Sequence, residues 1–197
     1  MSEPRRRRAP MTRRDRFLIW MASVAFIIAL FLLIVVGVLG LVRPFLVPTG
    51  SMTPAISPGD HVAMEGVTFL FRNPRRSDIV IFKTDGIPSM PAATIYEKRV
   101  VAEPGEQFHI SDGKLFINGQ RVAISNAAGE IIYQPPPGME SFSTTNDIVI
   151  PPGCYFVIGD NSTNSLDSRM YGAIPRSNIM GRVWFCYWPS GRIGRVK

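Results

Sequence analysis

The longest apolar run in the chain lies near its N-terminus and extends from Phe17 to Val42 without a charged residue or a proline. As a helix, these 26 residues would extend ~39 Å, which is more than the ~30 Å hydrocarbon core of a bilayer. A cleavable secretory signal has an apolar region of only about 7 to 15 residues, followed by a polar stretch with small residues at the cleavage site. This run ends instead at Arg43 and Pro44. The pattern therefore predicts one uncleaved transmembrane helix over residues 17–42.

Short apolar runs separated by turn sequences make up the chain beyond this helix. Asp112-Gly113 and Asn118-Gly119 supply the positive φ angles that tight hairpins require, so residues 106–124 are predicted to form a small meander. Strands are expected over residues 44–48, 61–66, 78–82, 94–101, 107–110, 115–117, 121–123, 155–158 and 181–188.

A polar stretch over residues 125–147 interrupts these strands and is predicted to be an insertion or an irregular surface loop. The 17 glycines and 17 prolines also favour turns over long helices outside the membrane. The predicted fold class is mainly β: an antiparallel β-sheet domain over residues 43–197 with a small inserted β region over residues 102–153. One transmembrane α-helix precedes this domain.

Basic residues are concentrated before the predicted helix. Residues 1–16 contain seven arginines against Glu3 and Asp15, whereas only Arg43 flanks the other end of the helix. Because positive flanks stay on the cytoplasmic side, residues 1–16 are predicted to be a cytoplasmic tail and residues 43–197 to lie outside the cytoplasm. The tail accounts for five of the seven net positive charges of the chain. The nearly balanced remainder disfavours a nucleic acid as a partner.

The residue types most often used for catalysis or metal binding occur without a supporting pattern. His61 and His109 lie in strand-like segments, and the spacings His-x-x-x-His and Cys-x-x-Cys are absent. The oxygen-rich run GDNSTNSLDSR lacks the ligand spacing and the bidentate Glu of an EF-hand loop. Cys154 and Cys186 lie in apolar segments, where they are either joined in a disulfide or free and buried. No metal or other cofactor is therefore expected.

Lysine is the remaining candidate for a base that acts near neutral pH. Lys98, in ATIYEKRVVAE, precedes Val100 and Val101, where burial would remove its hydration and lower its pKa from ~10.4. A shift to about 8 would cost about 3 kcal/mol, so only a site built around the amine would produce it. The alternative is a strand lysine that extends its amine into solvent. The chain has four lysines: Lys83, Lys98, Lys114 and Lys197.

A possible nucleophile follows the predicted helix closely. Ser51 lies in the turn sequence PTGSMTPAISPGD, which can expose both a hydroxyl group and a backbone N–H. A serine in a turn can equally serve only as a hydrogen-bonding turn residue.

Four segments in order, PTGSMTP, NPRRSDIVIFK, YEKRVVAEPGE and GDNSTNSLDSRMYG, resemble those of bacterial type I signal peptidases. These are membrane-anchored serine endopeptidases that remove signal peptides by a Ser-Lys dyad. The resemblance extends from about Phe45 to Arg182 and implies that Ser51 is the nucleophile and Lys98 the general base. It further implies that Thr49 joins the Ser51 backbone N–H as an oxyanion donor.

The same resemblance implies supporting and substrate-binding roles. Ser165 is expected to orient the lysine amine, and Asp167 and Arg169 to form a supporting ion pair. Shallow apolar pockets for small substrate residues are expected to be lined by Phe45, Val47, Met52, Ile56 and Tyr96. Two departures from the family pattern are Glu97, at a position that is usually apolar, and Ser162-Thr163 in place of Arg-Asp.

The implied function is removal of N-terminal signal peptides from exported preproteins after small residues. The implied enzyme is a monomer without a cofactor, and it crosses the bacterial inner membrane once. Two alternatives remain open: a conjugation-type peptidase that processes a pilin, and a non-catalytic, membrane-tethered β domain that binds envelope partners.

Overall fold

A computed structural model describes residues 11–38, 40–135 and 147–196, which belong to two compact units divided along the chain between Gly40 and Leu41. The predicted cytoplasmic tail lies outside the described residues up to position 10. The first unit is the helix α1 (Arg13–Val38), of which Arg13–Val35 is long and apolar enough to cross a membrane. Thr12 and Asp15 cap its N-terminus, because each backbone N–H donates to the side chain of the other residue.

The helix begins and ends about four residues earlier than the sequence predicts. The cap at Thr12 brings the first arginines into the helix, and at the other end Gly40 has a positive φ of 65°. Val42 pairs with Glu65 in the first strand of the second unit. The predicted C-terminal boundary at Val42 was therefore wrong, because β pairing takes this residue from the helix.

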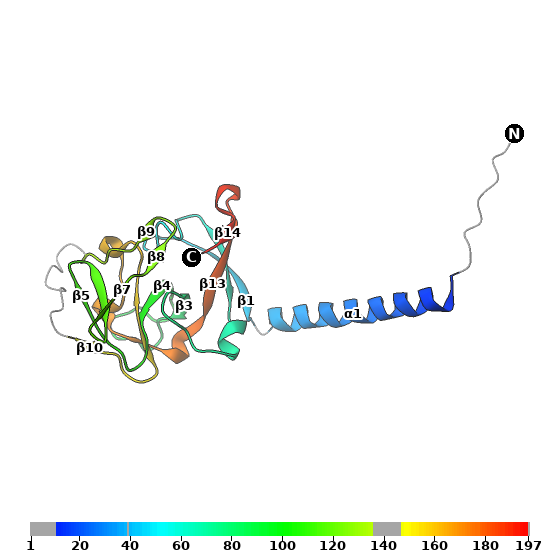
Figure 1. The fold of residues 1–197 in the computed structure, drawn as a ribbon, viewed down its shortest axis with the longest axis horizontal. Coiled ribbons are helices and arrows are strands. Elements are labelled where there is room, and N and C mark those ends of the chain that lie inside the picture. Colours follow the sequence, from blue (N-terminus) through cyan, green and yellow to red (C-terminus); the bar gives the residue numbers. More distant parts are fainter. Residues whose placement is uncertain (1–10, 39, 136–146, 197) are drawn as a thin grey trace. The chain divides into compact units, whose positions relative to one another are not determined.

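The second unit is built on an eight-stranded antiparallel sheet (Figure 1). Its strand order is β1-β2-β13-β3-β4-β11-β12, and β14 pairs with β13. The strands are β1 (Val42–Leu46), β2 (His61–Glu65), β3 (Ile79–Lys83), β4 (Ile95–Ala102), β11 (Cys154–Ile158), β12 (Ile174–Pro175), β13 (Ile179–Trp188) and β14 (Gly194–Arg195). Short helices connect them: η1 (Val67–Leu70), η3 (Ser162–Asn164), α2 (Ser168–Tyr171), η4 (Arg176–Asn178) and η5 (Ser190–Arg192).

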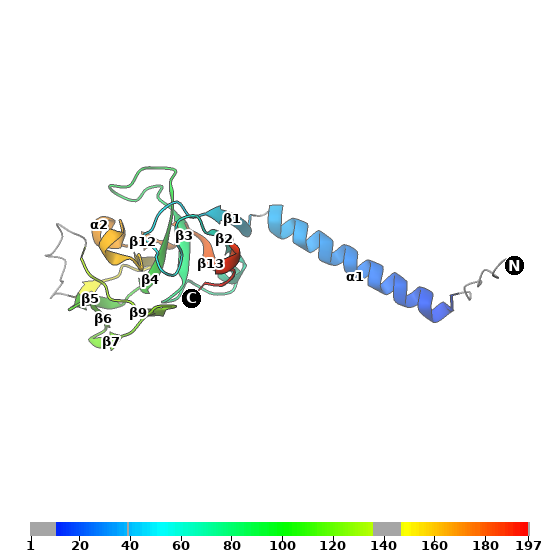
Figure 2. The same ribbon diagram turned by 90° about the horizontal axis from the view of Figure 1, so that it is seen from above.

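A second, four-stranded sheet with the order β10-β5-β6-β7 lies on the side of the domain away from β1 (Figure 2). The two predicted hairpins are confirmed, since Asp112 and Asn118 each have a φ of 50° and are each followed by a glycine with positive φ. The strands of this sheet are β5 (Gln107–Ser111), β6 (Lys114–Ile117), β7 (Gln120–Val122) and β10 (Ile148–Val149).

The segment predicted to be irregular from residue 125 is ordered in its first part. β8 (Ser125–Asn126) and β9 (Gly129–Glu130) form a hairpin, after which Ile131 and Tyr133 are buried. Backbone N–H groups of these two residues donate to the carbonyls of Ile124 and Gly113, which fixes the segment against the small sheet. The prediction was wrong for this part, because the apolar run Ile131-Ile132-Tyr133 is too short to indicate structure by itself, and Gly113, which holds Tyr133, lies in another segment. Residues 136–146 lie outside the described residues.

A buried apolar cluster joins the two sheets. Phe108 of β5 packs against Phe156 of β11 with ring centroids 4.2 Å apart, and both rings are buried. The second sheet thus shares its core with β4 and β11 of the main sheet, and the predicted class, a mainly β domain with a small inserted β region, is confirmed.

We expect Phe108→Ala to lower the free energy of unfolding by about 3–5 kcal/mol, because it removes a fully buried ring at the junction of the two sheets. Chemical unfolding of the detergent-solubilised protein, followed by circular dichroism, would measure this loss. The control Phe71→Ala removes a ring that is 85% exposed and should change stability by less than ~0.5 kcal/mol. Equal effects of the two substitutions would contradict the shared core.

Candidate active site

The loop between β1 and β2 holds Ser51 by means of its own buried side chains. Met52 and Ile56 are 0% exposed, and the Ile56 N–H donates to the Met52 carbonyl, so the segment after Ser51 is fixed in the core. The far side of the loop is fixed by Asn161, whose backbone N–H donates to the Ser51 carbonyl at 3.0 Å. The side-chain amide of Asn161 also donates to the Gly50 carbonyl at 3.1 Å. Ser51 is therefore held between the core and the segment that follows β11.

Lys98 reaches Ser51 from strand β4. Its amine Nζ lies 2.8 Å from Ser51 Oγ and 2.7 Å from the Glu97 carbonyl oxygen, and the residue is only 1% exposed. The ring of Tyr96 lies beside it, with the centroid 5.4 Å from Nζ. The sequence prediction that this lysine is buried is thus confirmed.

Burial lowers the pKa of the Lys98 amine, because water no longer stabilises the charged form. The carboxylates of Glu97 and Asp167 act in the opposite direction, but the net shift is downward. Burial likewise raises the pKa of the Glu97 carboxyl, and the neighbouring Lys98 partly reverses this change. A base with a lowered pKa next to a serine hydroxyl is the arrangement that proton abstraction requires.

A pocket of about 230 Å³ opens at this pair of side chains. Thr49 is exposed in it, and its Oγ1 lies 3.4 Å from Ser51 Oγ. Within the described ranges, the backbone N–H of Ser51 has no hydrogen-bond acceptor. The pocket lining comprises Thr49, Gly50, Ser51, Tyr96, Lys98, Asn164 and Leu166.

Asp167 and Arg169 form a buried ion pair in the segment after β11. The two carboxylate oxygens each accept a hydrogen bond of 2.8 Å from the guanidinium, and the same carboxylate accepts one of 3.2 Å from the Gly159 N–H. Arg169 also donates to the carbonyls of Ser162 and Gln134. The pair fixes the segment that faces Ser51 and Lys98.

Ser165 lies beside this segment, but it makes no hydrogen bond to the lysine. Its buried hydroxyl has no partner among the residues that the structure describes. It lies next to Gly159, where an added Cβ would be 2.3 Å from Ser165 Oγ and 2.5 Å from the Ser51 carbonyl oxygen. The site therefore has no room for a side chain at position 159, and the orienting role expected for Ser165 stays a prediction.

Sequence reasoning missed a second buried ion pair, between Arg99 and Asp160. Arg99 follows Lys98 directly, and its Nε and Nη2 each lie 2.7 Å from an oxygen of Asp160. Asn126 donates to the same carboxylate at 3.0 Å. Both charged residues lie in the resembling motifs YEKRVVAEPGE and GDNSTNSLDSRMYG, which was the only signal that could have indicated them.

The residues expected to bind substrate occupy different environments. Tyr96 lines the pocket, and Phe45 is partly buried on β1. Val47, Met52 and Ile56 are packed into the core, so their role in lining the pocket stays a prediction. Asn164 and Leu166, which sequence reasoning did not select, line the pocket instead.

The histidines and cysteines lie outside this pocket. His61 packs against Tyr187, and His109 bonds to Asp147 and stacks on Phe116. Both cysteines are free. Among the described residues, no group of three or more His, Cys, Asp or Glu side chains is arranged to hold a metal ion.

The chain is similar to proteins of one family over most of its length. The family model described as "Signal peptidase, peptidase S26" matches residues 19–188. Signal peptidase I of Leptolyngbya laminosa is 34% identical over 155 residues, which are 76% of this chain and 70% of that protein. The probable thylakoidal processing peptidase 2 of Arabidopsis thaliana is 36% identical over 159 residues, which are 79% of this chain and 41% of that protein.

One solved structure, a signal peptidase I from Enterococcus faecalis, has 27% sequence identity and a TM-score of 0.39. The match covers 56% of this chain and 97% of that one. The chain spans 41%, 44% and 64% of the lengths of three of the curated relatives that it matches.

We expect the stability of the protein to depend on the protonation of Lys98. Between its lowered pKa and the ordinary value of 10.5, the unfolded chain binds a proton at this position and the folded chain does not, so the free energy of unfolding rises with pH. Lys98→Met lacks this contribution and should give a flatter pH dependence. Chemical unfolding at several pH values from about 6 to about 10 would measure both curves.

Lys114→Met provides the matched control, because Lys114 is an exposed lysine in the β5–β6 hairpin. Its unfolding curve should keep the pH slope of the unchanged protein. Parallel slopes for the Lys98→Met variant and the unchanged protein would show that Lys98 has its ordinary pKa.

Proposed function

Because the chain belongs to the signal peptidase family, peptidase S26, we propose that it is a membrane-anchored serine endopeptidase that removes signal peptides from exported preproteins. The observation that carries this proposal is the 2.8 Å separation between the buried Lys98 amine and the Ser51 hydroxyl. Purely structural roles for the two side chains would not require a lysine in this position, since burial of an amine is unfavourable. The contact therefore favours an enzyme over a non-catalytic binding domain.

The proposed reaction uses Lys98 for both proton transfers. The neutral amine accepts the proton of Ser51 as Oγ attacks the carbonyl carbon of the scissile peptide bond. The resulting ammonium then donates this proton to the leaving amine, and the acyl group remains on Ser51. Water repeats the sequence: Lys98 removes its proton, the acyl bond breaks, and Ser51 recovers a proton from the ammonium.

Two donors are available for the negative charge that develops on the carbonyl oxygen. One is the backbone N–H of Ser51, and the other is the hydroxyl of Thr49, whose oxygen lies 3.4 Å from Ser51 Oγ. A donor aimed at this oxygen typically stabilises the transition state by about 2.7–4 kcal/mol. The exposed position of Thr49 at the pocket is consistent with this role.

The proposed substrate is an extended peptide that emerges from a membrane. A pocket of about 230 Å³ with Tyr96 and Leu166 in its lining suits small apolar residues before the cut. An extended peptide can pair its backbone with a strand edge, which leaves sequence choice to these small pockets. Specificity is then mainly steric.

The proposed topology places α1 across the cytoplasmic membrane once, with the arginine-rich segment inside and residues 41–197 outside. It is supported by the length and composition of Arg13–Val35 and by the excess of arginines before it. We propose that the enzyme acts as a monomer and needs no cofactor, because Ser51 and Lys98 together supply the nucleophile and the base.

Ser51→Ala and Lys98→Ala should each reduce cleavage of a preprotein by roughly 10⁴-fold or more, because each removes a reacting group. The measurement is incubation of the detergent-solubilised protein with a preprotein, followed by determination of the new N-terminus. Cleavage should follow a small residue. Ser57→Ala and Lys83→Ala, in the same loop and at the end of β3, are matched controls that should retain activity. Full activity of either dyad variant would exclude the mechanism, and cleavage confined to a pilin precursor would indicate a specialised peptidase.

Glu97→Gln should move the acid limb of the pH profile of kcat/KM to lower pH. The Glu97 carboxylate raises the pKa of Lys98, so its removal leaves more of the amine neutral at a given pH. Peptide cleavage measured across the acid limb tests this shift. Glu130→Gln removes a surface carboxylate paired with Arg121 and should leave the limb in place. A shift to higher pH would mean that Glu97 assists the base instead of opposing it.

A further inference from the structure

The segment after β9 is attached to the residues that follow β11 by one buried hydroxyl. We call residues 131–135 of this segment the inserted arm. Ser162 is 4% exposed, and its Oγ accepts a hydrogen bond of 2.8 Å from the Gln134 N–H. The same hydroxyl donates to the Ile132 carbonyl at 3.1 Å. Because one serine supplies both the acceptor and the donor, the arm is held here by its backbone.

Arg169 bonds to both sides of this contact. Its Nη1 donates to the Gln134 carbonyl at 2.7 Å, and its Nη2 donates to the Ser162 carbonyl at 2.6 Å. These three residues therefore form a closed ring of hydrogen bonds. The same guanidinium donates to both oxygens of Asp167 at 2.8 Å. The position of the guanidinium on Asp167 is thus determined partly by the inserted arm.

The ion pair of Asp167 and Arg169 is shielded from water, since the two side chains are 0% and 1% exposed. A buried pair of this kind is favourable only if its geometry is good and its other hydrogen bonds are made. Loss of the Ser162 hydroxyl would release the arm, and the Gln134 carbonyl would no longer hold Arg169 from that side. The charge of Asp167 would then be balanced less completely.

The same region of the chain also meets the second buried ion pair. Asn126 of β8 donates at 3.0 Å to the carboxylate of Asp160, with which Arg99 pairs. Tyr133, in the arm, is 2% exposed, and burial raises the pKa of its hydroxyl. The charges of Asp160 and Asp167 raise this pKa further, so the hydroxyl is close to both ion pairs.

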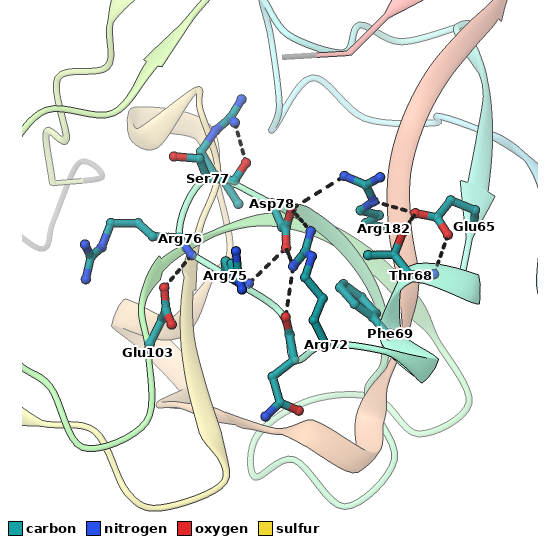
Figure 3. Close-up of polar contacts among 12 residues, drawn as sticks. Glu65, Thr68, Phe69, Arg72, Arg75, Arg76, Ser77, Asp78, Glu103 and Arg182 are labelled. Atoms are coloured by element: carbon teal, nitrogen blue, oxygen red, sulfur yellow. Dashed lines mark hydrogen bonds and ion pairs between the residues drawn. The ribbon is translucent and has the colours of Figure 1, made fainter.

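Arg99 is fixed from the opposite side by a turn of the main sheet. Its Nη1 donates to the Ser77 carbonyl at 2.9 Å. Ser77 precedes Asp78, whose carboxylate accepts a bidentate contact from Arg72 at 2.7 and 3.1 Å (Figure 3). Because this turn holds Arg99 without the arm, its ion pair depends on the arm less than the ion pair of Arg169 does.

The ion pair that the arm holds is also the one that acts on the amine of the proposed base. The carboxylate of Asp167 is close enough to Lys98 for its charge to raise the pKa of the amine. Glu97, on the same strand as the lysine, acts in the same direction. The hydroxyls of Tyr96 on β4 and Tyr171 in α2 lie in this region as well. The guanidinium on Asp167 offsets the charge of this carboxylate, so its position affects how much of the amine is neutral.

We propose that Ser162 is a positioning residue of the proposed reaction: its hydroxyl fixes the inserted arm against Arg169, which keeps the guanidinium on Asp167. The proposal rests on the proposed function. It adds that residues 131–135 contribute to the active site, although none of them lines the pocket at Ser51. Ser162 stands at a position where the chain departs from the family pattern, so resemblance could not indicate this attachment.

The test is Ser162→Ala in the detergent-solubilised full chain, with preprotein cleavage measured across the acid limb of the pH profile. We expect the acid limb of kcat/KM to move to higher pH by roughly half a unit or more, because a less balanced Asp167 favours the charged amine. On the limb itself, this shift lowers kcat/KM by roughly threefold or more at a given pH.

Two further variants serve as controls. Ser162→Thr keeps the hydroxyl and should keep the acid limb of the unchanged protein. Ser125→Ala removes an exposed hydroxyl of β8 and should move neither the limb nor the rate. An unmoved limb in Ser162→Ala would overturn the proposal even if the variant melts at a lower temperature, because a purely structural contact gives that combination. Equal shifts in the Ala and Thr variants would overturn it as well.

Gln134→Pro tests the same contact from the arm. It removes the N–H that donates to Ser162, and its backbone suits the substitution, since a residue before a proline is restricted to extended conformations. We expect the shift seen in Ser162→Ala. If Ser162→Ala does not fold, this variant decides the question, and an unmoved limb overturns the proposal.

Unfolding without a substrate separates this proposal from the proposed function. The free energy of unfolding rises with pH between the lowered pKa of Lys98 and its ordinary value of 10.5. In Ser162→Ala this rise should begin at a higher pH than in the unchanged protein. A later onset in a protein that cleaves no preprotein would contradict the proposed function but keep the effect of Ser162 on the amine. Identical onsets in an active enzyme would do the reverse.

Discussion

The site depends on the removal of water from one amine. A lysine on the surface of a protein keeps its proton at neutral pH, because solvent stabilises the charged form far better than the neutral one. Lys98 lies on β4, an inner strand of the main sheet, and is 1% exposed. Its amine lies against the Ser51 hydroxyl, the Glu97 carbonyl and the ring of Tyr96, which take the place of water around it. The sheet thus supplies the low polarity that the proposed base requires.

Carboxylates near such an amine raise its pKa, so their charges have to be balanced if the amine is to stay neutral. Asp167 raises the pKa of Lys98, yet the bidentate contact with Arg169 balances much of its charge. Asp160 is balanced in the same way by Arg99. The carboxylates can therefore fix the backbone after β11 without a large negative potential at the amine. Removal of one partner would leave a buried charge without compensation, which is strongly unfavourable.

The main features of this fold could be predicted from the sequence because their signals are local. Short apolar runs between turns indicated the longer strands, and Asn118-Gly119 indicated a hairpin, since only a few residue types adopt the required φ. The two-residue strands β8, β9, β10, β12 and β14 could not be predicted, because they are too short for an apolar pattern, and β10 and β12 also pair with segments about 20 or more residues away. The helix boundary at Val38 was missed for the same reason: Val42 is apolar enough for a membrane, but it pairs with Glu65.

Prediction of the candidate site from the sequence is limited in the same way, because contacts between distant segments are not visible in it. Composition could indicate Lys98 as a base, because few lysines are present and this one precedes an apolar run. Its contact with Ser51, which is 47 residues away, requires the order of the strands and could enter the sequence analysis only through resemblance. The lining of the pocket by Asn164 and Leu166 depends on how the segment after β11 is folded, which no spacing in the sequence indicates.

The order of elements along the chain also constrains which peptide bonds the site can reach. Leu41 lies at the junction with α1, and ten residues lead from it to Ser51. The first part of this segment is β1, which extends about 17 Å at ~3.3 Å per residue. The loop that follows is folded back by the contact between the Gly59 N–H and the Val47 carbonyl, so it adds less than its full length. In the proposed topology, Ser51 therefore stays within a few strand residues of the membrane surface. When a substrate is itself held in the bilayer, only the first extended residues after its apolar segment can reach the site. The length of β1 therefore limits how far from the membrane the peptide bond can be cut.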